Sequence, residues 1–340
     1  MKQIFPRPLY GDVDWMPVID AIRQAERIVL ITHCNPDGDG IGSQMALYDA
    51  LSSDSLLCHA GVAMHNRDAV PRIYSFLRHA DQARMGVWTE ACAAADVIIA
   101  LDCGARSRLG MPDSFFEGAT LINIDHHASN RRFGDINIVD ARYCATGAMI
   151  FDLLIAMGYA LNADTASAIY VAVMTDTASF RLASSTPAVY RMAADLVEAG
   201  AQPWPITVNV YESRSLSGLH MMTACLDTLE IHDGGLSAWV YVTDEMYRQT
   251  GADVEDTEGL IDYARSIEGV EIAVFIRSDE NVPGRWKVSF RGKTFANVGI
   301  LAGALGGGGH AYAAGCQLTG SFDEVRGRVQ AEVSRTLSAH

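Results

Sequence analysis

The chain has 340 residues, which is enough for two domains of ordinary size. Hydrophobic residues make up 49% and charged residues 20%, a balance typical of a globular enzyme and not of a disordered or fibrous protein. The formal net charge of −15 disfavours long DNA or RNA as the main partner, because such partners need broad basic surfaces, but it is compatible with a short anionic ligand in a locally positive or metal-filled pocket.

The sequence predicts neither a targeting signal nor a membrane segment. The first residues lack the apolar core of a signal peptide, and the best apolar run, 148–160, is interrupted by Asp152. The seven cysteines are scattered and form no Cys-x-x-Cys pair, which favours buried reduced thiols over a zinc site. We therefore expect a cytoplasmic protein with no membrane partner.

A stretch rich in aspartate and glycine follows the first predicted strand and precedes a helix. It carries His33, Asp37 and Asp39 at the carboxyl end of the strand, where open α/β sheets bind ligands. Its glycines let the backbone turn sharply and approach a phosphate closely. The alternative is a turn in which Asp37 or Asp39 only caps the next helix. The predicted elements here are a helix over 15–25, a strand over 27–31 and a helix over 41–51.

Two further buried strands end in polar residues. The apolar run 96–102 ends in Asp102, and the strand over 121–124 delivers the triplet Asp125–His127. Strands alternate with helices throughout this region, a pattern typical of a parallel, doubly wound α/β sheet. The remaining predicted elements are a strand over 56–62 and helices over 71–77, 88–95, 146–156, 163–174 and 187–199.

Two closely spaced prolines in the segment 200–205 mark the end of the first predicted domain. We expect a catalytic domain over 1–199, a helical linker over 200–229 and a smaller α/β domain over 230–340. In this last domain the predicted strands lie over 238–242, 271–277 and 285–291, and the predicted helices over 257–267, just before Gly306, and over 322–337.

Four segments of the first domain present metal-type ligands from strand or helix ends. The fourth is Asp176, which lies between two threonines after the helix over 163–174. Carboxylate oxygens mixed with imidazole suit Mn²⁺ or Mg²⁺, and the four aspartates and two histidines are about what two ions sharing one carboxylate need. Two ions roughly 3.5–4 Å apart can generate a hydroxide and hold the phosphoryl group that it attacks. Taken singly, each segment is more often a helix cap or a turn.

The second domain carries a basic stretch on an otherwise acidic chain. Between Arg277 and Lys293 there are five basic and two acidic residues, interleaved with aromatic ones, which suits a base stacked beside its phosphates. For Arg285 and Lys287, the solvated face of a two-stranded hairpin fits equally well. The glycines at 306–309 expose backbone N–H groups that can hold a terminal phosphate.

These motifs, in their order and spacing, resemble those of the DHH phosphoesterase family over about residues 27–317. The resemblance implies a doubly wound parallel-sheet DHH domain plus a smaller α/β DHHA1 domain, with the active site in the cleft between them. The motifs that carry it are His33-x-x-Pro-Asp-Gly-Asp-x-x-Gly-Ser, an Asp closing a buried strand, Asp-His-His, Thr-Asp-Thr and, for DHHA1, Gly-Gly-Gly-Gly-His followed by Ala-Ala-Gly.

The resemblance also implies two Mn²⁺ ions, with Mg²⁺ or another divalent cation as substitutes. The implied ligands are His33, Asp37 and Asp102 for one ion, and Asp39, Asp102, His126 and Asp176 for the other. The implied catalytic residues are Asp102 as the bridging ligand, Asp125 orienting a ligand histidine, and His127 facing the scissile phosphate. The implied substrate-binding residues are Arg291, Gly307, Gly308, Gly309 and His310.

Bacterial members with this architecture act as nano-RNases and as phosphatases of 3′-phosphoadenosine 5′-phosphate (pAp). The resemblance therefore implies hydrolysis of short RNA, of about two to five nucleotides, or of pAp to nucleoside monophosphates, and a homodimer. The alternatives are a phosphodiesterase of cyclic dinucleotides or pGpG, a pyrophosphatase or exopolyphosphatase, and a nucleotide sensor that does not cleave its ligand. The residues alone leave the choice of substrate open.

Overall fold

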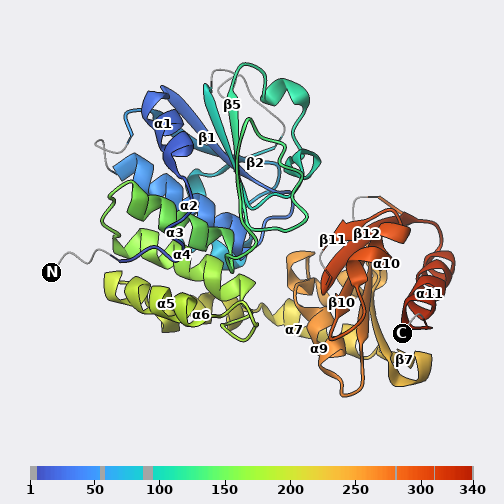
Figure 1. Cartoon of the computed structure of the whole chain (residues 1–340). Coiled ribbons are helices and arrows are strands. Elements are labelled where there is room, and N and C mark those ends of the chain that lie inside the picture. The colour runs from blue at the N-terminus through green and yellow to red at the C-terminus, as the bar shows by residue number, and fades with distance from the viewer. Residues whose placement is uncertain (1–5, 54–57, 87–94, 280–281, 310, 339–340) are drawn as a thin grey trace. The chain divides into compact units, whose positions relative to one another are not determined.

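The computed structural model describes residues 6–53, 58–86, 95–279, 282–309 and 311–338 (Figure 1). The chain divides into two compact units, Met1–Ser213 and Arg214–His340. Each unit contains one six-stranded sheet and its own hydrophobic core. Within the described ranges, no helix is both long and apolar enough to cross a membrane.

The first unit is built on a sheet with the strand order β3-β2-β1-β4-β5-β6, in which every pair is parallel. The chain order reverses between β1 and β4, so the carboxyl ends of these strands form the switch point at which such sheets bind ligands. The parallel α/β sheet predicted from the alternating pattern is confirmed. The strands are β1 (Arg27–Thr32), β2 (Gly61–Asn66), β3 (Arg84–Met85), β4 (Val97–Leu101), β5 (Thr120–Asp125) and β6 (Ile136–Val139).

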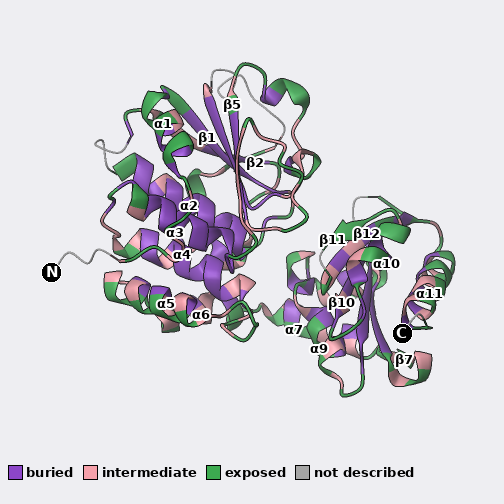
Figure 2. Cartoon of the chain, in the orientation of Figure 1, coloured by how far each residue is buried: buried purple, intermediate pink, exposed green. Residues whose placement is uncertain are grey.

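Apolar side chains cover both faces of this sheet, which explains why β1, β4 and β5 are continuous hydrophobic runs. On one face, Leu30, Ile99 and Ile122 pack against helices α1 to α4 (Figure 1). On the other face, Ile98 packs with Phe115 from a short 3₁₀ turn. Figure 2 shows buried residues concentrated along the strands and along α2, α3 and α4. The helices are α1 (Met16–Gln24), α2 (Gly38–Ser53), α3 (Thr146–Ala156), α4 (Ala163–Asp176), α5 (Pro187–Ala199) and α6 (Pro203–Tyr211).

Helices α2 and α4 approach each other closely because glycines line their contact. A Cβ atom added at Gly42 would lie 2.4 Å from the backbone oxygen of Ala168, and one added at Gly38 would lie 2.4 Å from Oγ1 of Thr175. The sequence predicted a loop here that ends near residue 41, whereas α2 begins at Gly38 and contains the glycines. These glycines therefore serve helix packing, which brings the start of α2 beside the end of α4.

Two other predictions for this unit differ from the structure. The strand predicted over 56–62 is β2, shifted to Gly61–Asn66, and the helix predicted over 71–77 is only a 3₁₀ turn at Arg72–Tyr74. The short strand β6 was not predicted, because four residues give too brief a pattern. The helix predicted over 88–95 falls almost entirely outside the described residues.

The first unit extends to Ser213 and does not end at residue 199, because α6 completes its core. Pro203 begins α6, a position where proline is favoured, so the two prolines start a helix. Ile206 and Val210 of α6 are buried in the first core. The next helix, α7 (Leu216–Leu226), belongs to the second unit, so the predicted linker is divided between the two.

The second unit has a mixed sheet with the order β11-β12-β10-β9-β8-β7. Only β8 and β9 pair in parallel, and the other pairs are antiparallel. The strands over 238–242, 271–277 and 285–291 were predicted to within a residue, whereas β7, β11 and β12 were not predicted. The strands are β7 (Glu230–His232), β8 (Ser237–Val242), β9 (Ile272–Ser278), β10 (Arg285–Gly292), β11 (Gly308–Gly309) and β12 (Ala313–Thr319).

Helices cover the two faces of this second sheet to different extents. On one face, Trp239, Val274 and Phe290 form a core with α10 and α11. On the other face, α7, α8 and α9 pack on β8 and β9 through residues such as Val240 and Phe275. The helices are α7 (Leu216–Leu226), α8 (Asp244–Thr250), which was not predicted, α9 (Leu260–Ser266), α10 (Val298–Ala304) and α11 (Phe322–Ser338).

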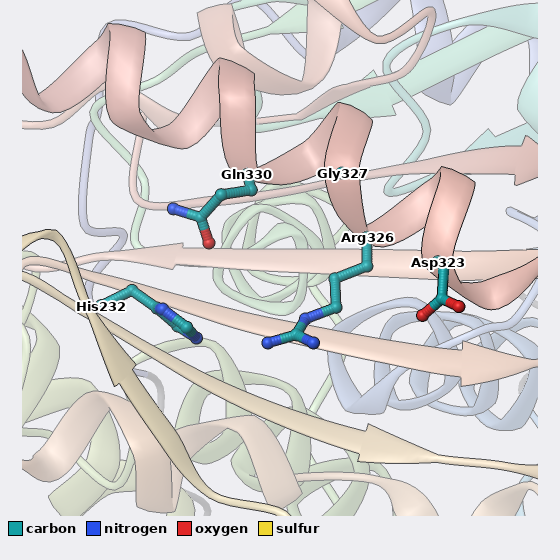
Figure 3. A pocket seen from close by; sticks show the side chains of 5 residues that line it. All are labelled: His232, Asp323, Arg326, Gly327 and Gln330. Carbon is teal, nitrogen blue, oxygen red and sulfur yellow. The ribbon is translucent and has the colours of Figure 1, made fainter.

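Polar contacts tie the edge strand β7 to α11 around an open pocket of about 330 Å³. In Figure 3, His232 at the end of β7 faces Arg326 and Gln330 of α11. Arg326 forms an ion pair with Glu230, and Gln330 donates a hydrogen bond to Asp233. These contacts protect the sheet edge, and none of the predicted site residues that the structure describes lines this pocket.

Candidate metal centre

The predicted metal ligands of the first unit lie together at the carboxyl edge of its sheet. His33 follows β1, Asp102 follows β4, and His126 follows β5. Two helices supply the other carboxylates, since Asp39 lies in the first turn of α2 and Asp176 is the last residue of α4. The close contact of α2 with α4 is therefore what places Asp39 and Asp176 in one cluster.

The first ligand group contains His33, Asp37 and Asp102. Nε2 of His33 lies 3.7 Å from Oδ1 of Asp37 and 3.5 Å from Oδ2 of Asp102. The side chains of His33 and Asp102 are buried, whereas that of Asp37 is 60% exposed. This group therefore has one side open to a ligand.

The second ligand group contains Asp39, His126 and Asp176, joined by the other oxygen of Asp102. Nε2 of His126 lies 3.6 Å from Oδ2 of Asp39, 3.7 Å from Oδ1 of Asp102 and 3.5 Å from Oδ2 of Asp176. The two carboxylate oxygens of Asp102 thus face different groups, Oδ2 toward His33 and Oδ1 toward His126. That is the arrangement of a bridging carboxylate.

The geometry of both groups fits divalent cations. Bond lengths of about 2.1 Å place neighbouring ligands about 3.0–3.4 Å apart in octahedral or tetrahedral geometry, slightly less than the separations here. Nδ1 of His33 lies 2.9 Å from the carbonyl oxygen of Cys34, and Nδ1 of His126 lies 3.3 Å from that of Tyr143. These contacts assign the ring N–H to Nδ1 and leave Nε2 as the ligand atom of each histidine.

Asp102 and Asp39 are both held by α3. The hydroxyl of Thr146 donates to Oδ1 of Asp102 over 3.1 Å. The backbone N–H groups of Thr146 and Gly147 donate to the carboxylate of Asp39 over 2.6 and 2.8 Å, and Ser43 donates to it over 3.3 Å. The N-terminus of α3 therefore fixes two buried carboxylates, and the positive end of its helix dipole stabilises their negative charge.

Asp37 has the capping role that the sequence left as an alternative. Its Oδ1 accepts hydrogen bonds from the backbone N–H groups of Asp39 and Gly40, each over 3.1 Å, at the start of α2. The same carboxylate faces His33 in the first ligand group. The cap and the ligand role are compatible, because a capping carboxylate keeps free lone pairs.

His127 lies beside the cluster and is held by Asp125. Its Nδ1 lies 2.6 Å from Oδ1 of Asp125 and 3.5 Å from Oδ1 of Asp102. The fully buried Asp125 also accepts a 2.5 Å hydrogen bond from Asn130. The resemblance implied that Asp125 orients a ligand histidine, but the structure pairs Asp125 with His127 and leaves the orientation of His126 to Tyr143.

The electrostatics of the cluster are those of crowded carboxylates. Burial and the neighbouring charges of Asp102 and Asp176 raise the pKa of Asp39 well above its usual value. Burial, together with the charge of Asp102, raises the pKa of Asp176 to about 6. Burial opposes the charged form of His33, but Asp102 and Asp37 raise its pKa to about 10. A bound cation would offset the repulsion between these carboxylates, which agrees with the ligand geometry.

The pKa of His127 is also raised. Burial alone would lower it, but the hydrogen bond to Asp125 and the charge of Asp102 outweigh that effect. The imidazole is thus stabilised in its protonated form beside the buried aspartates.

The substrate-binding residues expected in the second unit lie on neighbouring strands. Arg291 of β10 pairs with Ala313 of β12, and Gly308 of β11 pairs with Gly315 of the same strand. A Cβ atom at Gly307 would lie 2.1 Å from the oxygen of Gly315, whereas one at Gly308 would meet nothing within 4 Å. Packing therefore explains Gly307, and Gly308 faces open space. Gly309, with φ 146°, packs on β12 as Gly307 does. His310 lies outside the described residues.

The sequence analysis did not identify the residues that hold the ligands in place. The sequence placed Thr146 and Gly147 only at the start of a predicted helix. Every helix start has free backbone N–H groups whatever its residues, so the sequence could not show that these two bind Asp39. Asn130 had no signal beyond its place five residues after Asp125. Ser43 was present in the quoted motif but had no assigned role.

Comparison with known families agrees with this geometry. Residues 27–174 match the model of the DHH family, N-terminal domain, and residues 237–339 match the model of the DHHA1 domain. The first match contains every predicted metal ligand except Asp176.

Similar proteins cover nearly the whole chain. A relative from Thermus thermophilus, named bifunctional oligoribonuclease and PAP phosphatase NrnA, is 34% identical over 336 residues, with 98% of this chain and 97% of the relative covered. The crystal structure of an exopolyphosphatase-related protein from Bacteroides fragilis gives a TM-score of 0.85 at 27% identity, covering 96% of this chain and 98% of that one. RecJ from Thermus thermophilus, solved with Mn²⁺, shares the fold with a TM-score of 0.56 at 13% identity, covering 100% of this chain and 57% of RecJ. The chain therefore belongs to the DHH family of phosphoesterases and carries a C-terminal DHHA1 domain.

Proposed function

We propose that this phosphoesterase hydrolyses short oligoribonucleotides and pAp to nucleoside monophosphates with two bound Mn²⁺ ions. The observation that carries the proposal is the placement of Asp102, whose two oxygens face two separate ligand groups. A two-cation site of this kind suits in-line displacement at phosphorus. The choice of substrate is supported by the 34% identity to a relative named for both activities.

The proposed ligands are His33, Asp37 and Asp102 for one cation and Asp39, Asp102, His126 and Asp176 for the other. Their oxygen and imidazole donors suit Mn²⁺, with Mg²⁺ as a substitute. When bound, the cations lower the pKa of a water nucleophile and neutralise charge on the phosphoryl oxygens. Asp39 and Asp102 are held by Thr146 and Gly147 before substrate arrives, so little reorganisation is needed.

His127 is the proposed proton donor. Its Nδ1 is engaged by Asp125, and Nε2 is the proposed donor atom. As water adds to phosphorus and the P–O bond to the leaving nucleoside breaks, Nε2 gives its proton to the departing oxygen. Asp125 acts as a positioning residue that keeps the ring in this orientation. In the second unit, Arg291 and the open side of Gly308 are proposed to bind the far phosphate.

A matched pair of buried aspartates from α2 tests the proposal. Asp39 lies in the ligand cluster, whereas Asp49 accepts hydrogen bonds from Thr165 and Asn162 away from it. Asp39→Asn should lower Mn²⁺-dependent hydrolysis of an RNA dinucleotide and of pAp by about a hundredfold or more, because it removes a ligand. Asp49→Asn should retain hydrolysis. Equal activity in both variants would refute the assignment of the site.

Exopolyphosphatase activity is a second candidate, favoured by the 27% identity to the exopolyphosphatase-related protein. A polyphosphate chain offered with Mn²⁺ tests it, through release of orthophosphate. The nucleotide-sensor alternative predicts binding of these nucleotides without turnover. The homodimer and the cytoplasmic location stay predictions.

A further inference from the structure

We propose that the segment 9–12 positions the metal ligand His126, acting through Tyr143 and Asp152. This inference rests on the proposed metal site and adds residues that determine its affinity for the cation. It starts from a carboxylate that has no part in the ligand cluster. Asp152 interrupts the apolar helix α3 and is 1% exposed. A buried carboxylate on an apolar helix is costly unless hydrogen-bond donors surround it.

Three donors from two parts of the chain meet at Asp152. Its Oδ1 accepts a 2.7 Å hydrogen bond from the backbone N–H of Leu9, and its Oδ2 accepts one of 3.0 Å from that of Tyr10. The hydroxyl of Tyr143 donates to the same Oδ2 over 2.7 Å. Asp152 therefore joins the segment 9–12, which forms neither helix nor strand, to the turn that precedes α3.

Side-chain contacts strengthen this connection. The rings of Tyr10 and Tyr143 pack edge to face with their centroids 4.7 Å apart, and the hydroxyl of Tyr10 donates to the carbonyl oxygen of Arg142 over 2.9 Å. The guanidinium of Arg142 lies over the Tyr10 ring, 4.7 Å from its centroid. It also forms ion pairs with Asp12 and Asp140. These contacts fix the turn that carries Tyr143.

The same turn supports the ligands of the metal site. The carbonyl oxygen of Tyr143 lies 3.3 Å from Nδ1 of His126, the contact that leaves Nε2 for the cation. The backbone N–H of Asp140 donates to the carbonyl oxygen of Asp125, which directly precedes His126. Thr146, which donates to two ligand carboxylates, follows a few residues later. A shift of this turn would therefore move the acceptor that fixes the ring of His126.

Tyr143→Phe tests the proposal, because it removes only the hydroxyl that Asp152 accepts and keeps the ring and the carbonyl oxygen. We expect the Kd for Mn²⁺, measured by calorimetry, to rise about tenfold, the lower end of the loss when a group that orients a ligand is removed. In hydrolysis of an RNA dinucleotide, the Mn²⁺ concentration for half-maximal rate should rise by the same factor. Because the ligands themselves are intact, kcat at saturating Mn²⁺ should change less than about twofold.

A second measurement reports on the ring of His126 without metal or turnover. In the chelator-treated protein, the Nδ1–H proton of His126 should give an NMR signal that is protected from exchange, because the carbonyl of Tyr143 accepts it. This signal, identified by its absence in His126→Gln, should be lost or exchange faster in Tyr143→Phe. The Nδ1–H signal of His127, which Asp125 accepts, should be unchanged and serves as an internal reference.

The matched control is Tyr159→Phe. Tyr159 is another buried tyrosine of the same core, and its hydroxyl accepts a 2.8 Å hydrogen bond from Asn162, which is no part of the ligand cluster. Both variants lose a buried hydroxyl, so both should lower the melting temperature by about 2–4 °C. Only Tyr143→Phe should change the Mn²⁺ affinity and the His126 signal. Tyr10→Leu, which removes the ring and hydroxyl contacts of the segment itself, should change both in the same direction as Tyr143→Phe.

Three outcomes would overturn the proposal. One is an equal change of Mn²⁺ affinity in Tyr143→Phe and Tyr159→Phe, and another is a His126 signal that is the same in wild type and Tyr143→Phe. The third is a change in Tyr143→Phe that Tyr10→Leu does not reproduce, which would refute the role of the segment. Failure of the proposed function looks different: the wild-type chain would hydrolyse neither pAp nor RNA, while the NMR measurement on the metal-free protein would still report on the ring of His126.

Discussion

At the scale of single residues, Asp102 combines backbone strain with a central place in the site. Its φ of 54° lies in the left-handed region that non-glycine residues seldom adopt, and its side chain is almost fully buried. Aspartate tolerates this conformation better than most residues. The strained turn at the end of β4 is what directs its two oxygens to the two ligand groups, which is the kind of place where such strain is found.

The Asp125–His127 pair predicts a non-additive effect on turnover. His127→Gln should lower kcat for an RNA dinucleotide by about 10²–10⁴-fold, the range for loss of a general acid. Asp125→Asn should lower kcat less, and the double variant should be no slower than His127→Gln, because Asp125 acts through His127. Steady-state kinetics of the three variants check this, with Mn²⁺ binding by calorimetry as the control. Additive losses would mean that the two residues act independently.

The raised pKa of Asp176 predicts how pH changes the stability of the metal-free protein. Its pKa is about 6 in the folded chain and about 4 in an unfolded one, so the folded state binds the proton more tightly. The stability contributed by this proton is therefore present below about pH 4 and lost as the pH rises through about 6. Thermal unfolding with chelator at pH 5 and pH 7 should show this loss, and Asp176→Asn should reduce it. The same pH dependence in both proteins would contradict the prediction.

At the scale of elements, the contact between α2 and α4 is what assembles the ligand cluster. Gly42→Ala should destabilise the first unit by about 1–3 kcal/mol, because its Cβ would lie 2.4 Å from the backbone oxygen of Ala168. Metal affinity should fall as well, since the shift moves Asp39 away from Asp176. Urea unfolding and calorimetric titration with Mn²⁺ measure the two effects.

The control for this prediction is Gly327→Ala in α11, where an added Cβ would meet nothing within 4 Å. This variant should be stabilised by about 0.5–1 kcal/mol, the usual gain of alanine over glycine in a helix, with Mn²⁺ binding unchanged. If Gly42→Ala were as stable as wild type, the close approach of α2 and α4 would not be needed for the site.

The elements that could be predicted from the sequence are those with strong local patterns. Strands β1, β4 and β5 could be predicted from their apolar runs and from the prolines, glycines and aspartates around them. Buried parallel strands are continuous hydrophobic stretches, which are easy to recognise. β12 was missed, because its alanine and glycine residues favour strands weakly and it is held by pairing with β10. The prolines before α6 were assigned to a domain boundary, because the same signal also starts helices.

At the scale of the whole molecule, an acidic chain of two units places three basic residues on one face of its second sheet. The net charge is −15, yet the second sheet places Arg277, Lys287 and Arg291 on one face. On the proposed function, the acidic remainder of the surface disfavours a long RNA more than a short one. The six proposed metal ligands were named from the resemblance to the DHH family, but the distances between them and their support by α3 required the folded chain.

The measurement that tests the central claim most directly is a product profile with Mn²⁺. The substrates, offered in parallel, are pAp, a 5′-labelled RNA dinucleotide, a 24-nucleotide RNA, pGpG, pyrophosphate and polyphosphate, with Asp102→Asn as the inactive control. We predict rapid release of mononucleotides from pAp and the dinucleotide, little cleavage of the long RNA or pyrophosphate, and no turnover by the variant. Turnover of pyrophosphate or polyphosphate alone, or hydrolysis that survives in Asp102→Asn, would contradict the account.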